Sequence, residues 1–297
     1  MRAPEVRPSP TLLVVVGAVV ISFSPVFVRI ADVGPMTAGF YRTAFGAAAL
    51  LVYTRARREQ LWNGPAPFGF AVACGLLFAA DLRLWHQAIH YVGPGLATIL
   101  GNFQAFVLAA YGIVIHRERP GWRFVVSLPL ALVGLFLLVG ANWSALPPEA
   151  RTGVLLGFST ALAYAGYVIV YQQSQRSRVR VTPAASLTAI SLVTAAAMGI
   201  GALSEGESLA IPDGSSLLSM VGYGVLCQAL GWILISLGLP RLPTSRAGLI
   251  LLLQPTLSFI WDILFFGRAT GWTEWIGASL ALGAIYLGAN RPRRAKS

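Results

Sequence analysis

The amino-acid sequence predicts an all-α polytopic membrane protein with ten transmembrane helices in two inverted five-helix repeats. Of its 297 residues, 56% are hydrophobic and 11% are charged, and the mean hydropathy is +0.69. A soluble domain carries about 25% charged residues, so this composition indicates a chain that lies largely within lipid. Ten apolar stretches run along the chain, and its second half repeats the first at a spacing of 150 positions.

The repeat is visible in individual residues. Matching residues 150 positions apart are Ala97 and Ala247, Gln104 and Gln254, and Gly121-Trp122 and Gly271-Trp272. Each half holds five spans, an odd number, so the second half must enter the membrane with the opposite orientation. Inverted repeats are typical of alternating-access carriers, which bind their substrate near the bilayer midplane between the halves. We expect the two repeats to occupy residues 1–146 and 147–297.

Most of the predicted spans have the roughly 17–25 residues that cross about 30 Å of hydrocarbon. They are expected at 11–30, 36–53, 68–89, 94–114, 122–140, 152–172, 184–203, 216–238, 246–266 and 272–289. Pro25 and Pro255 lie inside the first and ninth of them. Because proline interrupts the backbone hydrogen bonds of a helix, both residues are hinge candidates, and ordinary helix packing is the alternative.

The positive charges define an orientation. The net charge is +11 and the sequence pI is about 10.5, which by itself is also typical of nucleic-acid binding. With the N-terminus inside, 17 basic residues fall on the cytoplasmic side and only Arg29, Arg151 and Arg268 on the outer side. This positive-inside bias predicts that both termini are cytoplasmic, and it accounts for the basic pI without a nucleic-acid partner. The single lysine among 22 basic residues favours a bacterial source, hence an inner-membrane location.

Several segments carry a resemblance to a known family. They are Tyr41-Arg42 at the start of span 36–53, residues 88–97 with 116–120, and residues 243–247 with Gln254-Pro255. Over essentially its whole length the chain resembles the EamA-type members of the drug/metabolite transporter superfamily. The resemblance implies ten helices, two EamA-type repeats, and export or exchange of small metabolites, often amino acids. The aromatic amino-acid exporters of bacteria are the nearest functional analogue.

The chain also departs from that family pattern. Glu118 closes the signature of the fourth span, but Arg268 stands at the matching place in the second copy. Where the repeats of the family usually have a Glu-Pro pair, this chain has Gln104-Ala105 and Gln254-Pro255. The resemblance therefore does not extend to a coupling mechanism that relies on those acids.

Two repeat-related amides mark the middle of the bilayer. Gln104 and Gln254 lie about ten residues into their spans, or roughly 15 Å along each helix. A glutamine amide can both donate and accept hydrogen bonds, which suits a zwitterionic or polar substrate. The alternative is a hydrogen bond between helices that stabilises the bundle.

Four charged residues, Arg42, Asp81, Arg83 and Asp262, lie within predicted spans. Charges there are costly and are usually paired or directed into a cavity. They are expected either as static ion pairs, such as Arg42 with Asp81, or as an outer gate or an anchor for a substrate carboxylate or amine. Asp81 and Asp262 are also candidates for a coupled proton, although the substrate gradient alone is an equally good driving force. Asp81 and Arg83 lie about 200° apart around a helix and cannot serve one face.

Aromatic and amide side chains complete the predicted cavity. On the third span an acidic–aromatic stripe is expected to hold an amine, and aromatic residues repeat on one face of the sixth and eighth spans. With Gln104 and Gln254, the candidate cavity residues are Phe78, Asp81, Trp85, Asn102, Tyr164, Tyr167, Gln228 and Trp232. For each residue alone, helix packing is the alternative. The set favours an amphipathic organic solute over an inorganic ion.

The sequence contains no phosphate-binding loop, zinc motif or serine–histidine–aspartate constellation, so it predicts no catalytic residue, metal or cofactor. The predicted function is secondary export of small organic metabolites by alternating access, with a small-molecule substrate and the lipid bilayer as partners. A carrier for nucleotide-sugars or other phosphorylated solutes, which would use Arg42 and Arg83, is the first alternative. A membrane-embedded lipid enzyme is the second.

Overall fold

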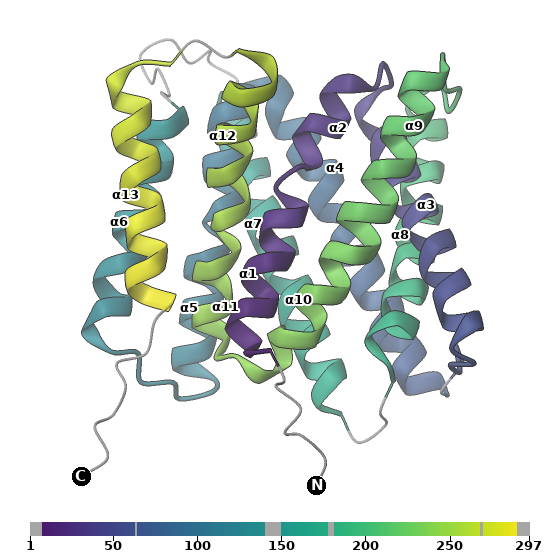
Figure 1. Ribbon diagram of the computed structural model, residues 1–297, viewed down its shortest axis with the longest axis horizontal. Helices are drawn as coiled ribbons and strands as arrows, with labels where there is room; N and C mark the ends of the chain where they lie inside the picture. Colours follow the sequence, from purple (N-terminus) through teal and green to yellow (C-terminus); the bar gives the residue numbers. More distant parts are fainter. Residues whose placement is uncertain (1–7, 63, 140–149, 178–180, 268–269, 290–297) are drawn as a thin grey trace, which may run out of the picture.

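The computed structural model describes residues 8–62, 64–139, 150–177, 181–267 and 270–289. Every regular element in these residues is helical, and the helices stand side by side in one bundle (Figure 1). The start of α1 and the end of α13 lie toward the same end of the bundle (Figure 1). The boundary expected between residues 146 and 147 lies outside the described residues.

The order of the elements follows the predicted spans. The first half comprises α1 (Pro10–Ile21), α2 (Ser24–Ile30), α3 (Pro35–Ala56), α4 (Pro65–Asn102), α5 (Gln104–Val114) and α6 (Trp122–Val139). The second half comprises α7 (Ala150–Arg176), α8 (Pro183–Ser204), α9 (Gly214–Gly222), η2 (Tyr223–Gly231), α10 (Trp232–Gly238), η3 (Leu239–Arg241), α11 (Thr244–Leu251), α12 (Leu253–Phe266) and α13 (Trp272–Ala289). Helices therefore occupy all ten of the predicted ranges.

Within the described residues, seven helical segments are long and apolar enough to cross a membrane, and an eighth, Trp122–Leu137, is apolar but shorter. The fold is therefore that of a polytopic, all-helical membrane protein, as predicted. The total of ten membrane crossings stays a prediction, since α3 and α13 are helices without being among the seven.

Helix α4 differs from the expected pair of separate spans. It runs without a break through residues that were assigned to the third and the fourth span. A straight helix would separate Trp85 and Gly101, sixteen positions apart, by about 24 Å. Instead, a Cβ on Gly101 would lie 3.9 Å from Cδ1 of Trp85. The chain therefore folds back within α4, so a tight reversal with helical backbone replaces the expected loop.

Both predicted hinge prolines coincide with breaks in their helices. A proline clashes with the carbonyl four residues earlier, and α1 ends at Ile21, four residues before Pro25. In the same way α11 ends at Leu251, four residues before Pro255. The first copy is interrupted at Phe103, between α4 and α5, without any proline nearby. These breaks are structural facts, whereas motion about them stays a prediction.

The tightest helix packing joins the first half of the chain to the second. The most extensively packed pairs are α4 with α7, α6 with α13, α3 with α8, α4 with α8, and α3 with η2, followed by α1 with α10 and α5 with α11. Glycines allow this approach: a Cβ on Gly17 would lie 2.7 Å from the carbonyl oxygen of Gly231, and one on Gly46 would lie 2.4 Å from Cγ of Gln228. The residues at the centre of the bundle are therefore contributed by both halves.

Glutamates after three helices bind the starts of other helices. After α8, Glu207 accepts hydrogen bonds from the amides of Met36 (3.3 Å) and Thr37 (2.7 Å) at the start of α3. After α3, Glu59 accepts one from the hydroxyl of Thr182 at 2.5 Å, immediately before α8. The first amides of a helix lack partners within it. Glu207 binds two such amides directly, whereas Glu59 binds the Thr182 hydroxyl, whose oxygen accepts a hydrogen bond from the amide of Ala185 in α8.

The third glutamate joins α5 to α11. Glu118 accepts hydrogen bonds from the amides of Thr244 (2.7 Å) and Ser245 (3.3 Å) and from the Ser245 hydroxyl (2.5 Å). Thr244 in turn donates its hydroxyl to Oε1 of Gln172 on α7 at 2.8 Å. This contact therefore links the segment after α5, in the first half of the chain, to the start of α11 in the second half.

Candidate functional site

Arg42 lies on α3 with only 7% of its surface exposed. Its Nε donates to Oε1 of Gln228 at 2.9 Å, and its Nη1 donates to the hydroxyl of Tyr223 at 3.0 Å. The guanidinium carbon lies 4.9 Å from the ring centre of Tyr223 and 5.3 Å from that of Phe78. Among the described residues, nothing accepts a hydrogen bond from Nη2. One edge of a rigidly held buried cation therefore remains without a protein acceptor.

Asp81 brings a carboxylate to the same region from α4 and is 8% exposed. It interacts electrostatically with Arg42 and with Tyr164 on α7. Within the described part of the chain it makes neither a hydrogen bond nor an ion pair. A buried carboxylate without donors is costly, and in membrane proteins such residues mark functional sites more often than structural ones.

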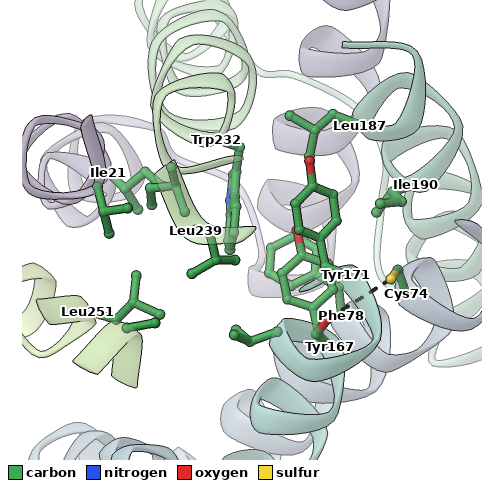
Figure 2. Close-up of a cluster of buried hydrophobic side chains, with 14 of the residues drawn as sticks. Ile21, Cys74, Phe78, Tyr167, Tyr171, Leu187, Ile190, Trp232, Leu239 and Leu251 are labelled. Atoms are coloured by element: carbon green, nitrogen blue, oxygen red, sulfur yellow. Dashed lines mark hydrogen bonds between the residues drawn. The ribbon is translucent and has the colours of Figure 1, made fainter. Parts of the chain in front are cut away.

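An aromatic wall of packed rings lies beside these charges. Phe78 stacks on Tyr167 with ring centres 5.2 Å apart, and Trp232 packs edge-on against Tyr167 at 5.0 Å. Tyr164 lies 6.1 Å from Tyr167 and 6.5 Å from Trp232. Figure 2 shows Trp232 standing between the Tyr167–Tyr171 pair on one side and Ile21 and Leu251 on the other. We call Arg42, Phe78, Asp81, Tyr164, Tyr167, Tyr223, Gln228 and Trp232 the central cluster.

Three of the amide side chains predicted for the site, all of them glutamines, differ in how they are engaged. Gln228 is fully engaged, because its Nε2 also donates to the hydroxyl of Ser191 at 3.0 Å. Gln254 lies beside the Tyr164 hydroxyl, and its Nε2 is buried without a hydrogen-bond partner in the described part of the chain. On the other repeat, the same holds for Oε1 of Gln104 on α5. The two repeat-related amides thus both retain an unused polar atom.

The expected ion pair between Arg42 and Asp81 was wrong. Arg42 instead donates hydrogen bonds to the side-chain oxygens of Gln228 and Tyr223, two neutral residues on η2.

The other two charges, Arg83 and Asp262, belong to ion pairs that are more exposed. Arg83 lies 2.9 Å from Glu205, with both side chains substantially exposed. Asp262 contacts Arg29, whose guanidinium also covers the ring of Phe266. As the helical geometry predicted, Asp81 and Arg83 face in different directions. Exposed pairs of this kind contribute little to stability, and they leave Asp81 as the buried acid of the site.

Two predicted cavity residues are engaged elsewhere. Trp85 packs against His86 and, near the reversal of α4, against the hydrophobic cluster formed with the start of α7. Asn102 donates its side-chain amide to the carbonyl of Thr98, one turn earlier in its own helix, at 2.7 Å. Of the remaining eight predicted cavity residues, six are in the central cluster and Gln254 lies beside Tyr164. Gln104 is buried on α5.

Tyr223 is a central residue that the helical pattern did not identify. It lies five positions before Gln228, and on an α-helix this spacing places two side chains on different faces. The segment Tyr223–Gly231 is π-helical, and a π-helix brings residues i and i+5 together. Both side chains therefore reach Arg42. The glycines flanking and interrupting this segment were the only signal in the sequence.

The comparison with protein families gives a clear result. The model of the EamA-like transporter family matches this chain twice, over residues 9–140 and 151–289. The chain belongs to the EamA-like transporter family. It is therefore a multi-pass membrane transporter of the drug/metabolite superfamily, and the predicted membership is confirmed.

Individual relatives of this EamA-like transporter are distant but extensive. An uncharacterized transporter of Archaeoglobus fulgidus is 25% identical over 278 residues, covering 92% of this chain and 94% of the relative. A protein of Salmonella typhimurium named as a probable amino-acid metabolite efflux pump is 24% identical over 65% of this chain and 66% of its own. A solved crystal structure shares the fold with a TM-score of 0.81 and 19% identity, covering 94% of this chain and 97% of that one.

Proposed function

We propose that this chain exports small zwitterionic organic solutes, amino acids or related compounds, across a bacterial inner membrane by alternating access. The observation that carries the proposal is the pair of opposite charges, Arg42 and Asp81, buried in one cluster without pairing with each other. Arg42 offers Nη2 to a substrate carboxylate, and Asp81 offers an acceptor to a substrate ammonium group. A zwitterion would neutralise both charges at once, which reduces the cost of keeping each of them buried.

The aromatic wall supports an amphipathic rather than a purely polar solute. Phe78, Tyr164, Tyr167 and Trp232 surround the charged pair with rings. Such rings favour an apolar body, and their faces also attract an ammonium group. The name of the Salmonella typhimurium relative supports the same substrate class. A phosphorylated solute would need several cations, whereas Arg42 is buried and Arg83 lies at the surface in an ion pair.

The arrangement of the helices supports alternating access between repeats at 1–146 and 147–297. Each of the five closest helix pairs joins one half to the other, and the central cluster draws on both. A relative movement of the halves would therefore open the cluster to one side of the membrane and then to the other.

The test uses the purified full-length chain in proteoliposomes and a panel of labelled amino acids, nucleotide-sugars and sugar phosphates. Asp81→Asn removes one charge at nearly constant shape, and Arg42→Gln removes the other with a shorter polar side chain. The loss of one charge-assisted hydrogen bond, about 1.5–3 kcal/mol, weakens half-saturation roughly 10- to 150-fold. The matched controls are Arg55→Gln and Asp32→Asn, which change exposed residues.

Substrate analogues separate the two roles. An N-acetylated amino acid has no ammonium group, so it should be insensitive to Asp81→Asn. An amino-acid amide has no carboxylate, so it should be insensitive to Arg42→Gln. Equal transport of the zwitterion by parent and both variants would contradict the proposal, as would uptake restricted to phosphorylated solutes.

A further inference from the structure

Two buried N–H groups, one in the central cluster and one beside it, have no hydrogen-bond partner among the residues that the structure describes. They are Nε1 of Trp232, whose side chain is 1% exposed, and Nε2 of Gln254. Buried polar groups are nearly always paired, because an unpaired one loses its hydration without compensation. Neither group contributes to packing through its polar atom. A phenylalanine would fill the place of the indole ring, and a leucine that of the amide, without this cost.

Both donors lie near one residue, Tyr164. Tyr164 has its ring centre 6.5 Å from that of Trp232, and its hydroxyl lies beside the Gln254 side chain. Tyr164 also interacts electrostatically with Asp81. The indole therefore comes from α10 and the amide from α12, and Tyr164 connects both to the charged part of the site. A substrate held by Asp81 would extend its side chain toward these donors.

We propose that Nε1 of Trp232 and Nε2 of Gln254 donate hydrogen bonds to an oxygen on the side chain of the substrate. This inference rests on the proposed function and makes it narrower: the substrates are zwitterions whose apolar side chain carries a hydroxyl, carbonyl or sulfoxide oxygen. Arg42 and Asp81 bind the part that all amino acids share, and the two N–H groups distinguish one side chain from another. A site built to pair such an oxygen rejects an analogue that lacks it, because its donors are then left unpaired.

The experiment compares substrates that differ by one oxygen atom. The pairs are phenylalanine with tyrosine, and methionine with methionine sulfoxide. The measured quantity is the ratio of half-saturating concentrations, oxygen-free over oxygen-bearing, for uptake into proteoliposomes. Ligand-induced thermal stabilisation of the purified protein provides the same ratio for binding. The parent should show a ratio of about ten or more in both pairs.

Substitutions then assign the preference to the donors. Trp232→Phe removes the N–H and keeps an aromatic ring, whereas Gln254→Leu removes the amide and keeps the approximate volume. Each should lower the ratio severalfold by weakening the oxygen-bearing solute alone. Trp275→Phe on α13, where the tryptophan is 45% exposed, is the matched control and should keep the parent ratio.

The outcomes are distinguishable. If the parent transports and binds no amino acid, the proposed function fails, and this inference fails with it. If amino acids are transported with a parent ratio near one, or if both variants keep the parent ratio, only this inference is overturned. Should Trp232→Phe not fold, Gln254→Leu tests the same ratio on a different helix.

Discussion

Replacing Glu118 with alanine should loosen the start of α11 selectively. The Glu118 carboxylate accepts two amide hydrogen bonds and one hydroxyl hydrogen bond from Thr244 and Ser245. Loss of a side chain that caps a helix start costs about 0.5–2 kcal/mol. Hydrogen bonds to a charged group lie at the upper end of the range for single bonds, but water can replace part of them, since Glu118 is partly exposed. We therefore expect a cost of about 1–2 kcal/mol.

Amide hydrogen exchange measured by mass spectrometry on the full-length protein tests this value locally. A cost of about 1–2 kcal/mol corresponds to roughly 5- to 30-fold faster exchange at the start of α11. Glu274→Ala is the matched control, because Glu274 accepts a hydrogen bond from Gly271, three residues away, at the start of its own helix. Exchange in 244–251 that is the same in Glu118→Ala and the parent would refute the argument. So would equal acceleration by Glu274→Ala.

Two further perturbations follow from packing and charge. Gly46→Ala would place a Cβ 2.4 Å from Cγ of Gln228, so thermal unfolding should show a loss of about 1–3 kcal/mol together with reduced uptake. A Cβ on Gly69 would have no other atom within 4 Å, so the control variant Gly69→Ala should be neutral or should stabilise the protein by up to about 1 kcal/mol. Hydrogen bonds from the Ser215 hydroxyl and Ser216 amide hold the pKa of Asp213 below its usual value. These hydrogen bonds to ionised Asp213 therefore stabilise the start of α9 fully above about pH 4, and the stabilisation is lost as the pH falls through the lowered pKa. Amide hydrogen exchange at Ser216, measured as a function of pH, would show this loss. Asp213→Ala should remove that acid-dependent step.

The sequence predicted the helices well because its strongest signals are local. Length and hydropathy identify a membrane span without knowledge of any neighbour, and proline marks the residue four positions earlier as a helix end. Both breaks near Pro25 and Pro255 follow this rule. The reversal inside α4 lies where the sequence has Gly93-Pro94-Gly95, between the predicted spans 68–89 and 94–114. The sequence predicted two spans there, but it did not predict the helical backbone of the reversal.

The candidate site was predictable in its membership but not in its pairings. Burial of a charge such as Arg42 or Asp81 in an apolar stretch is visible in the sequence. Which neighbour binds it depends on the rotation of one helix against another. The π-helical turn of η2 brings Tyr223 and Gln228 together on Arg42, and no 3.6-residue periodicity could have suggested that.

The repeat is asymmetric where helix starts are bound by glutamates. Glu59, Glu207 and Glu118 each accept hydrogen bonds at the start of a helix or at the residue immediately before it. At the spacing of 150, the place of Glu118 is taken by Arg268, which lies outside the described residues, and an arginine side chain has no acceptor. Its donor partner changes as well, since Pro94 stands where the second copy has Thr244, and proline has no amide hydrogen. The positions that match Glu118 and Thr244 in the other repeat therefore hold neither the acceptor nor the donor of this contact. In the proposed alternating access, the Glu118 contact could therefore close only one end of the bundle, and opening toward the two sides of the membrane would break different bonds.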